Sequence, residues 1–80
     1  MPRKSTFTSE YRRLCLLLRN ARKQAGLTQQ EMARRLDRPQ SYVSKYEKGE
    51  RRLDVVEFLH IAKVIRIDAC LLLKKLTQKR

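Results

Sequence analysis

Apolar residues recur at intervals of three and four along most of the chain, and no segment alternates between apolar and polar positions over the length of a strand. Spacing of this kind places the apolar side chains on one face of a helix. Glycine and proline, which often mark the turns between strands, occur only twice each. The pattern therefore predicts an all-α protein.

The first predicted helix runs from about Ser9 to Ala25. Arg22 falls within its apolar stripe, where a charge is costly to bury, so the guanidinium should either reach solvent or meet a carboxylate. Leu16 and Leu17 lie away from the stripe and are either a subunit contact or tolerated surface leucines. At about 100° per residue, the stripe expected to enter the core consists of Tyr11, Leu14, Cys15, Leu18, Ala21 and Ala25.

A second, shorter helix is predicted after Gly26, which ends the first helix by taking positive φ without strain. Thr28 and Glu31 match a capping box, in which each side chain satisfies a backbone N–H at the helix start. The helix should stop near Asp37 because Pro39 disfavours a helical residue before it. The residues expected to face inward are Met32, Ala33 and Leu36.

The third predicted helix extends from about Gln40 to Lys48 and is closed by Gly49. Val43 and Tyr46 lie together on one side of it, which should therefore face the core. The opposite side is polar and carries Gln40, Ser41, Ser44, Lys45 and Lys48.

Two further helices follow. Asp54 and Glu57 match a second capping box at the start of a fourth helix, and Asp68 can cap a fifth. The fifth helix contains three adjacent leucines, residues 71–73, which cannot all face one core, so at least one should face solvent or a second subunit. The fourth helix is strongly apolar and should be central to the core through Val55, Phe58, Leu59, Ile61, Ala62 and Ile65.

The length and charge of the chain narrow the class of protein. Eighty residues suit one domain, 1–80, with a folded part of about 9–77 and short, loosely ordered basic ends, "MPRKSTF" and "TQKR". Twenty Lys and Arg against eight Asp and Glu give a net charge of +12. This excess favours a polyanionic partner, with nucleic acid as the first candidate, over a merely solubilising surface.

Several other classes are disfavoured. No apolar run approaches the roughly eighteen residues of a membrane span, and the start lacks the apolar stretch of a secretory signal, so we expect a cytoplasmic, nucleoid-associated protein. Cys15 and Cys70 lack the spacing of a zinc site or a disulfide framework, and both are expected to be small buried residues. His60 has no evident nucleophile or metal ligands near it and should lie at the core edge. We therefore expect no enzyme activity, no cofactor, no metal and no small-molecule ligand.

Two short helices around a tight corner suggest a helix-turn-helix, whose second helix can enter a groove of DNA. Within residues 29–48, the fifth position is the small Ala33, where the two helices should cross closely. The eighth is apolar Leu36, just before the corner. The fifteenth and eighteenth are Val43 and Tyr46, which should pack under the second helix.

Together these features resemble the phage repressor and Cro-like helix-turn-helix family, also called the XRE family. The resemblance covers roughly residues 18–68 and implies a compact five-helix bundle of the lambda-repressor-like type, with DNA as partner and no catalysis. Asp37 and Pro39 depart from the family's usual glycine and serine or threonine cap, and Arg66 replaces a common glycine, so the fourth helix could run one turn longer. The matching stretches are "LRNARKQAGLTQQEMARRL", "PQSYVSKYEKGERRLD" and "VVEFLHIAKVIRID".

In that family the second helix of the motif lies in the major groove and the first crosses the DNA backbone. Glutamine can bond adenine through two atoms, lysine donates to guanine, and serine serves either base. Such contacts carry sequence information that a phosphate contact does not. By position, the resemblance implies base contacts by Gln40, Ser41, Ser44 and Lys45.

The resemblance also implies roles around that helix. Thr28 and Gln29 head the first motif helix, where free amides and the helix dipole suit a phosphate oxygen. The family counterpart of Gln29 braces that of Gln40, and Glu47 occupies an acidic position that suggests an ion pair with Arg22. The residues expected to contact the DNA backbone are Thr28, Gln29, Arg38, Tyr42, Lys48, Arg51 and Arg52.

The leading hypothesis is a sequence-specific double-stranded DNA binder that regulates transcription as a Cro-like, controller, antitoxin-type or stand-alone XRE regulator. A homodimer on a palindromic operator would follow, with the fifth helix as candidate interface. The alternative is a protein-interaction adaptor that uses the same fold and binds nucleic acid non-specifically, but Gln40, Ser41 and Ser44 are poor anchors for a protein partner. A cationic membrane-surface protein is disfavoured by the helix caps and Gly49.

Overall fold

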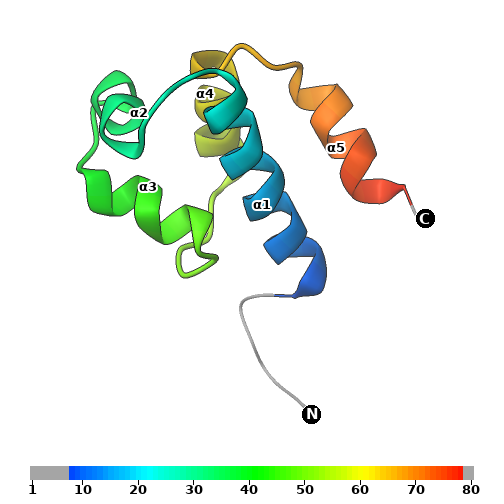
Figure 1. The fold of residues 1–80 in the computed structure, drawn as a ribbon. Helices are drawn as coiled ribbons and strands as arrows, with labels where there is room; N and C mark the ends of the chain where they lie inside the picture. Colours follow the sequence, from blue (N-terminus) through cyan, green and yellow to red (C-terminus); the bar gives the residue numbers. More distant parts are fainter. Residues whose placement is uncertain (1–7, 79–80) are drawn as a thin grey trace.

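The computed structural model describes residues 8–78, which form five helices and no strand (Figure 1). The predicted all-α fold is confirmed. The expected basic end "MPRKSTF" and the last two residues of "TQKR" lie outside the described residues. The helices are α1 (Ser9–Gln24), α2 (Gln29–Leu36), α3 (Gln40–Glu47), α4 (Val55–Val64) and α5 (Ala69–Thr77).

The five helices pack around one core. α1 lies between the α2–α3 pair and α5, and α4 contacts both α2 and α5 (Figure 1). Each helix contributes at least one buried side chain to this core, so the fold depends on all five. The buried cluster consists of Leu18, Met32, Ala33, Tyr42, Val43, Tyr46, Phe58, Ile61, Ile65 and Leu72.

The helix starts follow the capping signals of the sequence. Thr28 and Glu31 form the predicted capping box, with the Thr28 amide donating to Glu31 Oε1 at 2.8 Å and the Glu31 amide to Thr28 Oγ1 at 3.1 Å. Asp54 and Glu57 form the second box. Asp68 caps α5 through its Oδ1. These bonds satisfy amides that have no partner within the helix, so they fix where α2, α4 and α5 begin.

The helix ends use left-handed backbone. Gly26 and Gly49 take φ values of +79° and +81°, as a helix-closing glycine can. Asp37 takes φ +59° and ends α2, so the corner forms without the family's glycine. The suggestion that α4 runs one turn longer is wrong, because α4 ends at Val64 and Arg66 turns left-handed at φ +58°.

Some side chains expected in the core are exposed. Val55 and Leu59 of α4 are 72% and 48% exposed, because the buried stripe of that helix follows Phe58, Ile61 and Ala62. Cys70 is exposed because α5 turns Leu72 inward, and a residue two positions away lies on the far side of a helix. Ala25, beyond the end of α1, and His60 are likewise exposed.

The leucines behave differently from one another. In α5 only Leu72 of the three adjacent leucines is buried, which confirms that they do not share one face. In α1, Leu16 is exposed, whereas Leu17 packs partly against the core, so the expectation that it points away is wrong.

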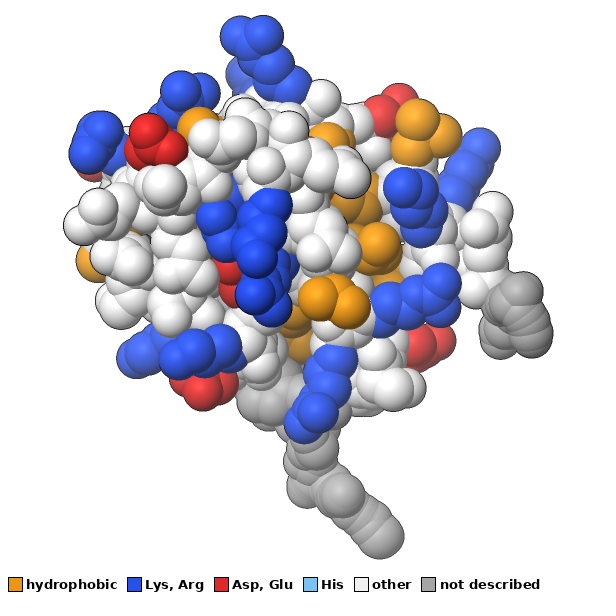
Figure 2. All heavy atoms as spheres, in the orientation of Figure 1, with side chains coloured by type: hydrophobic (Ala, Val, Ile, Leu, Met, Phe, Trp, Pro, Cys, Tyr) orange, Lys and Arg blue, Asp and Glu red, His pale blue; other side chains and the backbone are white. Residues whose placement is uncertain are grey.

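Hydrophobic side chains gather on the surface near α1 and α5 (Figure 2). No helix of residues 8–78 is long and apolar enough to cross a membrane.

Candidate nucleic-acid interface

α2 and α3 meet at a tight corner and form the predicted helix-turn-helix. Ala33 is 3% exposed at the crossing, where a larger side chain would hold the helices apart. The Arg38 amide donates to the Ala33 carbonyl at 2.9 Å, which closes the end of α2 around left-handed Asp37. Pro39 stands at the start of α3 with no side-chain cap, as its lack of a polar side chain predicts.

α3 divides into a buried and an exposed side. Val43 and Tyr46 are 0% and 1% exposed and anchor the helix on the core, which confirms their predicted position. The side chains predicted to contact bases lie on the other side. Three of them, Gln40, Ser41 and Lys45, are exposed, and Ser44 is half-buried.

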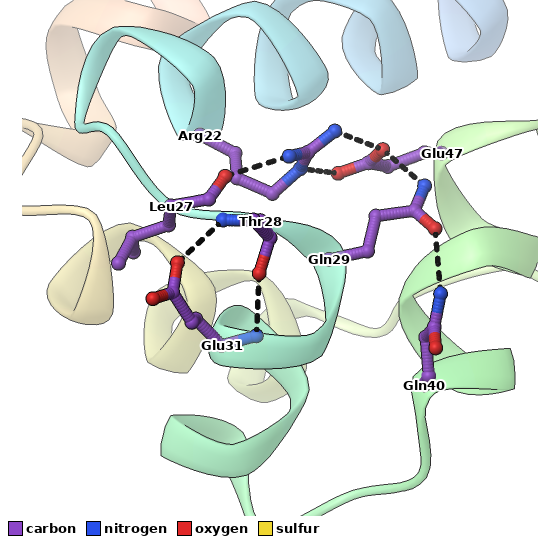
Figure 3. Close-up of polar contacts among 7 residues, drawn as sticks. All are labelled: Arg22, Leu27, Thr28, Gln29, Glu31, Gln40 and Glu47. Atoms are coloured by element: carbon purple, nitrogen blue, oxygen red, sulfur yellow. Dashed lines mark hydrogen bonds and ion pairs between the residues drawn. The ribbon is translucent and has the colours of Figure 1, made fainter.

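The predicted Arg22–Glu47 ion pair is present, and it is buried. Arg22 Nε lies 2.7 Å from Glu47 Oε2, and Nη2 donates to Oε1 at 3.2 Å (Figure 3). The two side chains are 8% and 3% exposed. Arg22 Nη1 also donates to the Leu27 carbonyl at 2.7 Å. The pair therefore ties α1, the α1–α2 turn and the end of α3 together.

A chain of polar contacts continues from this ion pair to the exposed edge of α3. Gln29 Nε2 donates to Glu47 Oε1 at 2.9 Å, and Gln40 Nε2 donates to Gln29 Oε1 at 3.4 Å (Figure 3). The expected bracing of Gln40 by Gln29 is thus confirmed. Because Glu47 fixes which end of the Gln29 amide points inward, Gln29 presents its oxygen to Gln40, whose own oxygen remains available as an acceptor.

The start of α2 is less open than the sequence suggested. The amide and hydroxyl of Thr28 are both engaged in the capping box, and its backbone hydrogen bond to Glu31 holds the pKa of that carboxyl below its usual range. A phosphate here would rely on the remaining amides of the first turn and on the helix dipole. Gln29 is half-buried and already bonded at both ends of its side-chain amide.

Tyr42 supports two arginines beside α3. The ring is 8% exposed, and this burial raises the pKa of its hydroxyl. The guanidinium carbons of Arg38 and Arg51 lie over the ring, 4.8 Å and 4.7 Å from its centroid. Both distances suit cation–π contacts, so the ring holds two positive charges next to the exposed edge of α3.

Arg51 is further restrained by α4. Its Nη2 lies 3.0 Å from Glu57 Oε2, and its Nη1 donates to Glu57 Oε1 at 3.1 Å and to the Arg52 carbonyl at 2.8 Å. The bidentate contact holds the pKa of the Glu57 carboxyl below its usual range. Lys48 and Arg52, the other expected backbone contacts of this region, are exposed.

The arrangement sets the chemistry that this surface can perform. Neutral amide and hydroxyl groups lie along the exposed edge of α3, and two ordered guanidinium groups lie beside it over the Tyr42 ring. Among residues 8–78 no three or more His, Cys, Asp or Glu side chains gather as a metal site. The fold and this surface define a helix-turn-helix protein of the DNA-binding regulator type.

Comparisons with known proteins agree with that class. The sequence profile of the HTH_3 helix-turn-helix family matches residues 18–72. The chain belongs to this XRE-type helix-turn-helix family. A comparison with curated proteins gave no match.

Two solved structures are similar to the chain. An XRE-family like protein from Pseudomonas syringae pv. tomato str. DC3000 superposes with a TM-score of 0.80 at 53% identity, over 85% of this chain and 83% of that protein. The restriction-modification controller protein C.AhdI from Aeromonas hydrophila has a TM-score of 0.75 at 28% identity, over 81% of this chain and 98% of that protein.

Proposed function

We propose that the protein binds double-stranded DNA in a sequence-specific way and regulates transcription by occupying an operator. The observation that carries this proposal is the braced polar edge of α3. Gln40 lies exposed at the start of the helix, and its amide is oriented through Gln29 and the buried Glu47. Orienting a polar side chain before binding lowers the entropy that must be lost when it contacts a base.

The exposed side chains of α3 suit base edges. A glutamine amide can pair with N6 and N7 of adenine, and Lys45 can donate to O6 and N7 of guanine. Ser41 and Ser44 can donate to or accept from either base. We assign direct base contact to Gln40, Ser41, Ser44 and Lys45.

The surrounding cations suit the phosphates. Arg38 and Arg51 are ordered beside α3 by Tyr42, and Lys48 and Arg52 are exposed on the segment that follows. Phosphate contacts set the position of a protein on DNA without selecting a sequence. The backbone contacts that we propose are Thr28, Gln29, Arg38, Tyr42, Lys48, Arg51 and Arg52.

We further propose that the protein acts as a homodimer on a palindromic site, with α5 in the interface. Leu71 and Leu73 are 58% and 42% exposed, and a groove between α1 and α5 is lined in part by Leu17, Ile67 and Leu71. A second copy could bury these side chains, and dimers of this motif class bind half-sites about one helical turn apart.

Selection from random duplex DNA tests this function. The protein should enrich one short sequence with twofold symmetry, and its affinity should fall steeply with salt because several phosphates are neutralised. Binding that depends on salt but enriches no sequence would refute specific regulation and would indicate the adaptor function instead.

A further inference from the structure

Residues 48–54 connect the end of α3 to the start of α4 and run beside the first turns of α1 (Figure 1). This segment carries Arg51 and Arg52, two of the proposed phosphate contacts. The amides of residues 48–50 still donate to carbonyls of α3, whereas those of residues 51–54 make no backbone–backbone hydrogen bond among the described residues. Where these two arginines point therefore depends on contacts made by other elements.

Tyr11 of α1 makes the contacts that span this segment. Its hydroxyl donates to the Arg51 carbonyl at 2.7 Å and accepts from the Leu53 amide at 3.0 Å. One oxygen thus joins two backbone groups on either side of Arg52, although they are 40 and 42 residues away in the sequence. Burial raises the pKa of Tyr11 to about 12, so the hydroxyl keeps its proton at neutral pH.

The Tyr11 ring takes part as well. The guanidinium carbon of Arg52 lies over that ring, 4.7 Å from the centroid. Tyr11 is 7% exposed, so the surrounding core holds the ring in place. The hydroxyl therefore sets the backbone of the segment, and the ring restrains the side chain that lies between the two hydrogen bonds.

We propose that Tyr11 is a positioning residue for DNA backbone binding, because it holds the Arg51–Arg52 segment in the conformation that meets the phosphates. This inference rests on the proposed function. Tyr11 itself need not touch DNA. Its effect is to order two cations before binding, which lowers the entropy lost when they contact phosphate oxygens.

We call the two hydrogen bonds of the Tyr11 hydroxyl, to the Arg51 carbonyl and from the Leu53 amide, the clamp. The Tyr11→Phe variant tests the clamp, because it removes the hydroxyl and keeps the ring. Tyr46→Phe is the matched control: Tyr46 is 1% exposed, and its hydroxyl makes no hydrogen bond among residues 8–78. Both variants and the unmodified protein would be titrated with a random duplex and with a selected duplex over a range of salt, after thermal melts show that each is folded at the assay temperature.

The clamp predicts that Tyr11→Phe lowers the affinity for both duplexes by the same factor, about 3- to 10-fold at low salt. The slope of log affinity against log salt concentration should become shallower by about 1. Tyr46→Phe should leave the slope unchanged. A loss of stability alone cannot move the slope of a protein that is folded throughout, so equal slopes for the two variants would overturn the proposal. Failure of the unmodified protein to bind either duplex would instead overturn the proposed function.

Amide exchange in the unmodified protein gives a measurement that does not depend on a variant's folding. The Leu53 amide donates to the Tyr11 hydroxyl, whereas the Arg52 amide has no acceptor among the described residues. The clamp predicts a larger protection factor at Leu53 than at Arg52, with each exchange rate compared with that of the same amide in an unfolded chain. Equal protection factors at the two amides would contradict it.

Discussion

At the scale of single residues, Glu47 connects the core of the fold to the candidate site. Its Oε1 accepts from Arg22 and Gln29, and its Oε2 accepts from Arg22. The carboxylate is almost fully enclosed, so its charge is tolerable only while these donors remain in place. The same side chain therefore stabilises the fold and orients the residues that lead to Gln40.

Glu47→Gln should lower the free energy of unfolding by about 3 kcal/mol, because it leaves the Arg22 charge buried without a partner. Denaturant unfolding measures the change. Glu50→Gln is the matched control, since Glu50 is exposed on the neighbouring turn and makes no ion pair among residues 8–78. If both variants unfolded at the same denaturant concentration, the buried pair would not have the stabilising role assigned to it.

Single residues also show what a sequence can and cannot predict. Arg22 was recognisable as a charge within an apolar stripe, and the resemblance supplied Glu47 as its partner. The stacking of Arg38 and Arg51 on Tyr42, and the clamp of Tyr11, had no such signal. The Tyr11 contacts join residues 40 and 42 positions apart, so they depend on how whole helices pack. The stacking on Tyr42 depends on the paths of the chain just before and after α3. Neither set of contacts changes the local pattern of apolar and polar positions.

At the scale of the elements, local chemistry sets where each helix begins and ends. The capping boxes at Thr28 and Asp54 and the glycine at 26 act within one helical turn, so the sequence was sufficient to place them. The buried face of a short helix is different, because the neighbouring helices select it. The sequence pattern therefore predicts Val55 and Cys70 in the core, although α4 and α5 turn them outward.

The join between α4 and α5 carries a strained residue. Arg66 takes φ +58°, where a side chain crowds the backbone and glycine does not. Arg66→Gly should therefore raise the free energy of unfolding by about 1 kcal/mol, after allowing for the greater freedom of glycine in the unfolded chain.

Arg66→Ala is the control for that change, because it removes the same side chain and keeps the strain. Thermal and denaturant unfolding should show a gain for glycine and almost none for alanine. A gain of equal size in both variants would mean that the long side chain, not the backbone conformation, limits stability at this position.

At the scale of the whole molecule, the net charge of +12 and the exposed leucines require different partners. The charge accounts for attraction to DNA but cannot select a sequence. The leucines of α5 suit a second copy of the chain. The composition alone predicts the attraction to DNA, whereas the groove between α1 and α5 appears only when the helices are placed against each other.

Leu71→Lys should weaken the proposed dimer about tenfold or more, because it places a charge at the centre of an apolar contact. Sedimentation equilibrium measures the effect. Val56→Lys is the control: Val56 is 59% exposed on α4, outside the residues that line the groove. An unmodified protein that stays monomeric, or equal dissociation constants for the two variants, would exclude α5 as the interface.

The central claim is that the braced edge of α3 selects DNA sequence, and parallel binding-site selection with the unmodified protein and with Gln40→Ala tests it most directly. The account predicts a twofold-symmetric site for the unmodified protein. It also predicts that Gln40→Ala loses the preference for one base at one position of each half-site. The binding free energy should weaken by about 1–3 kcal/mol on the selected duplex and change little on random DNA. An unchanged site, or equal losses on both kinds of DNA, would contradict the claim.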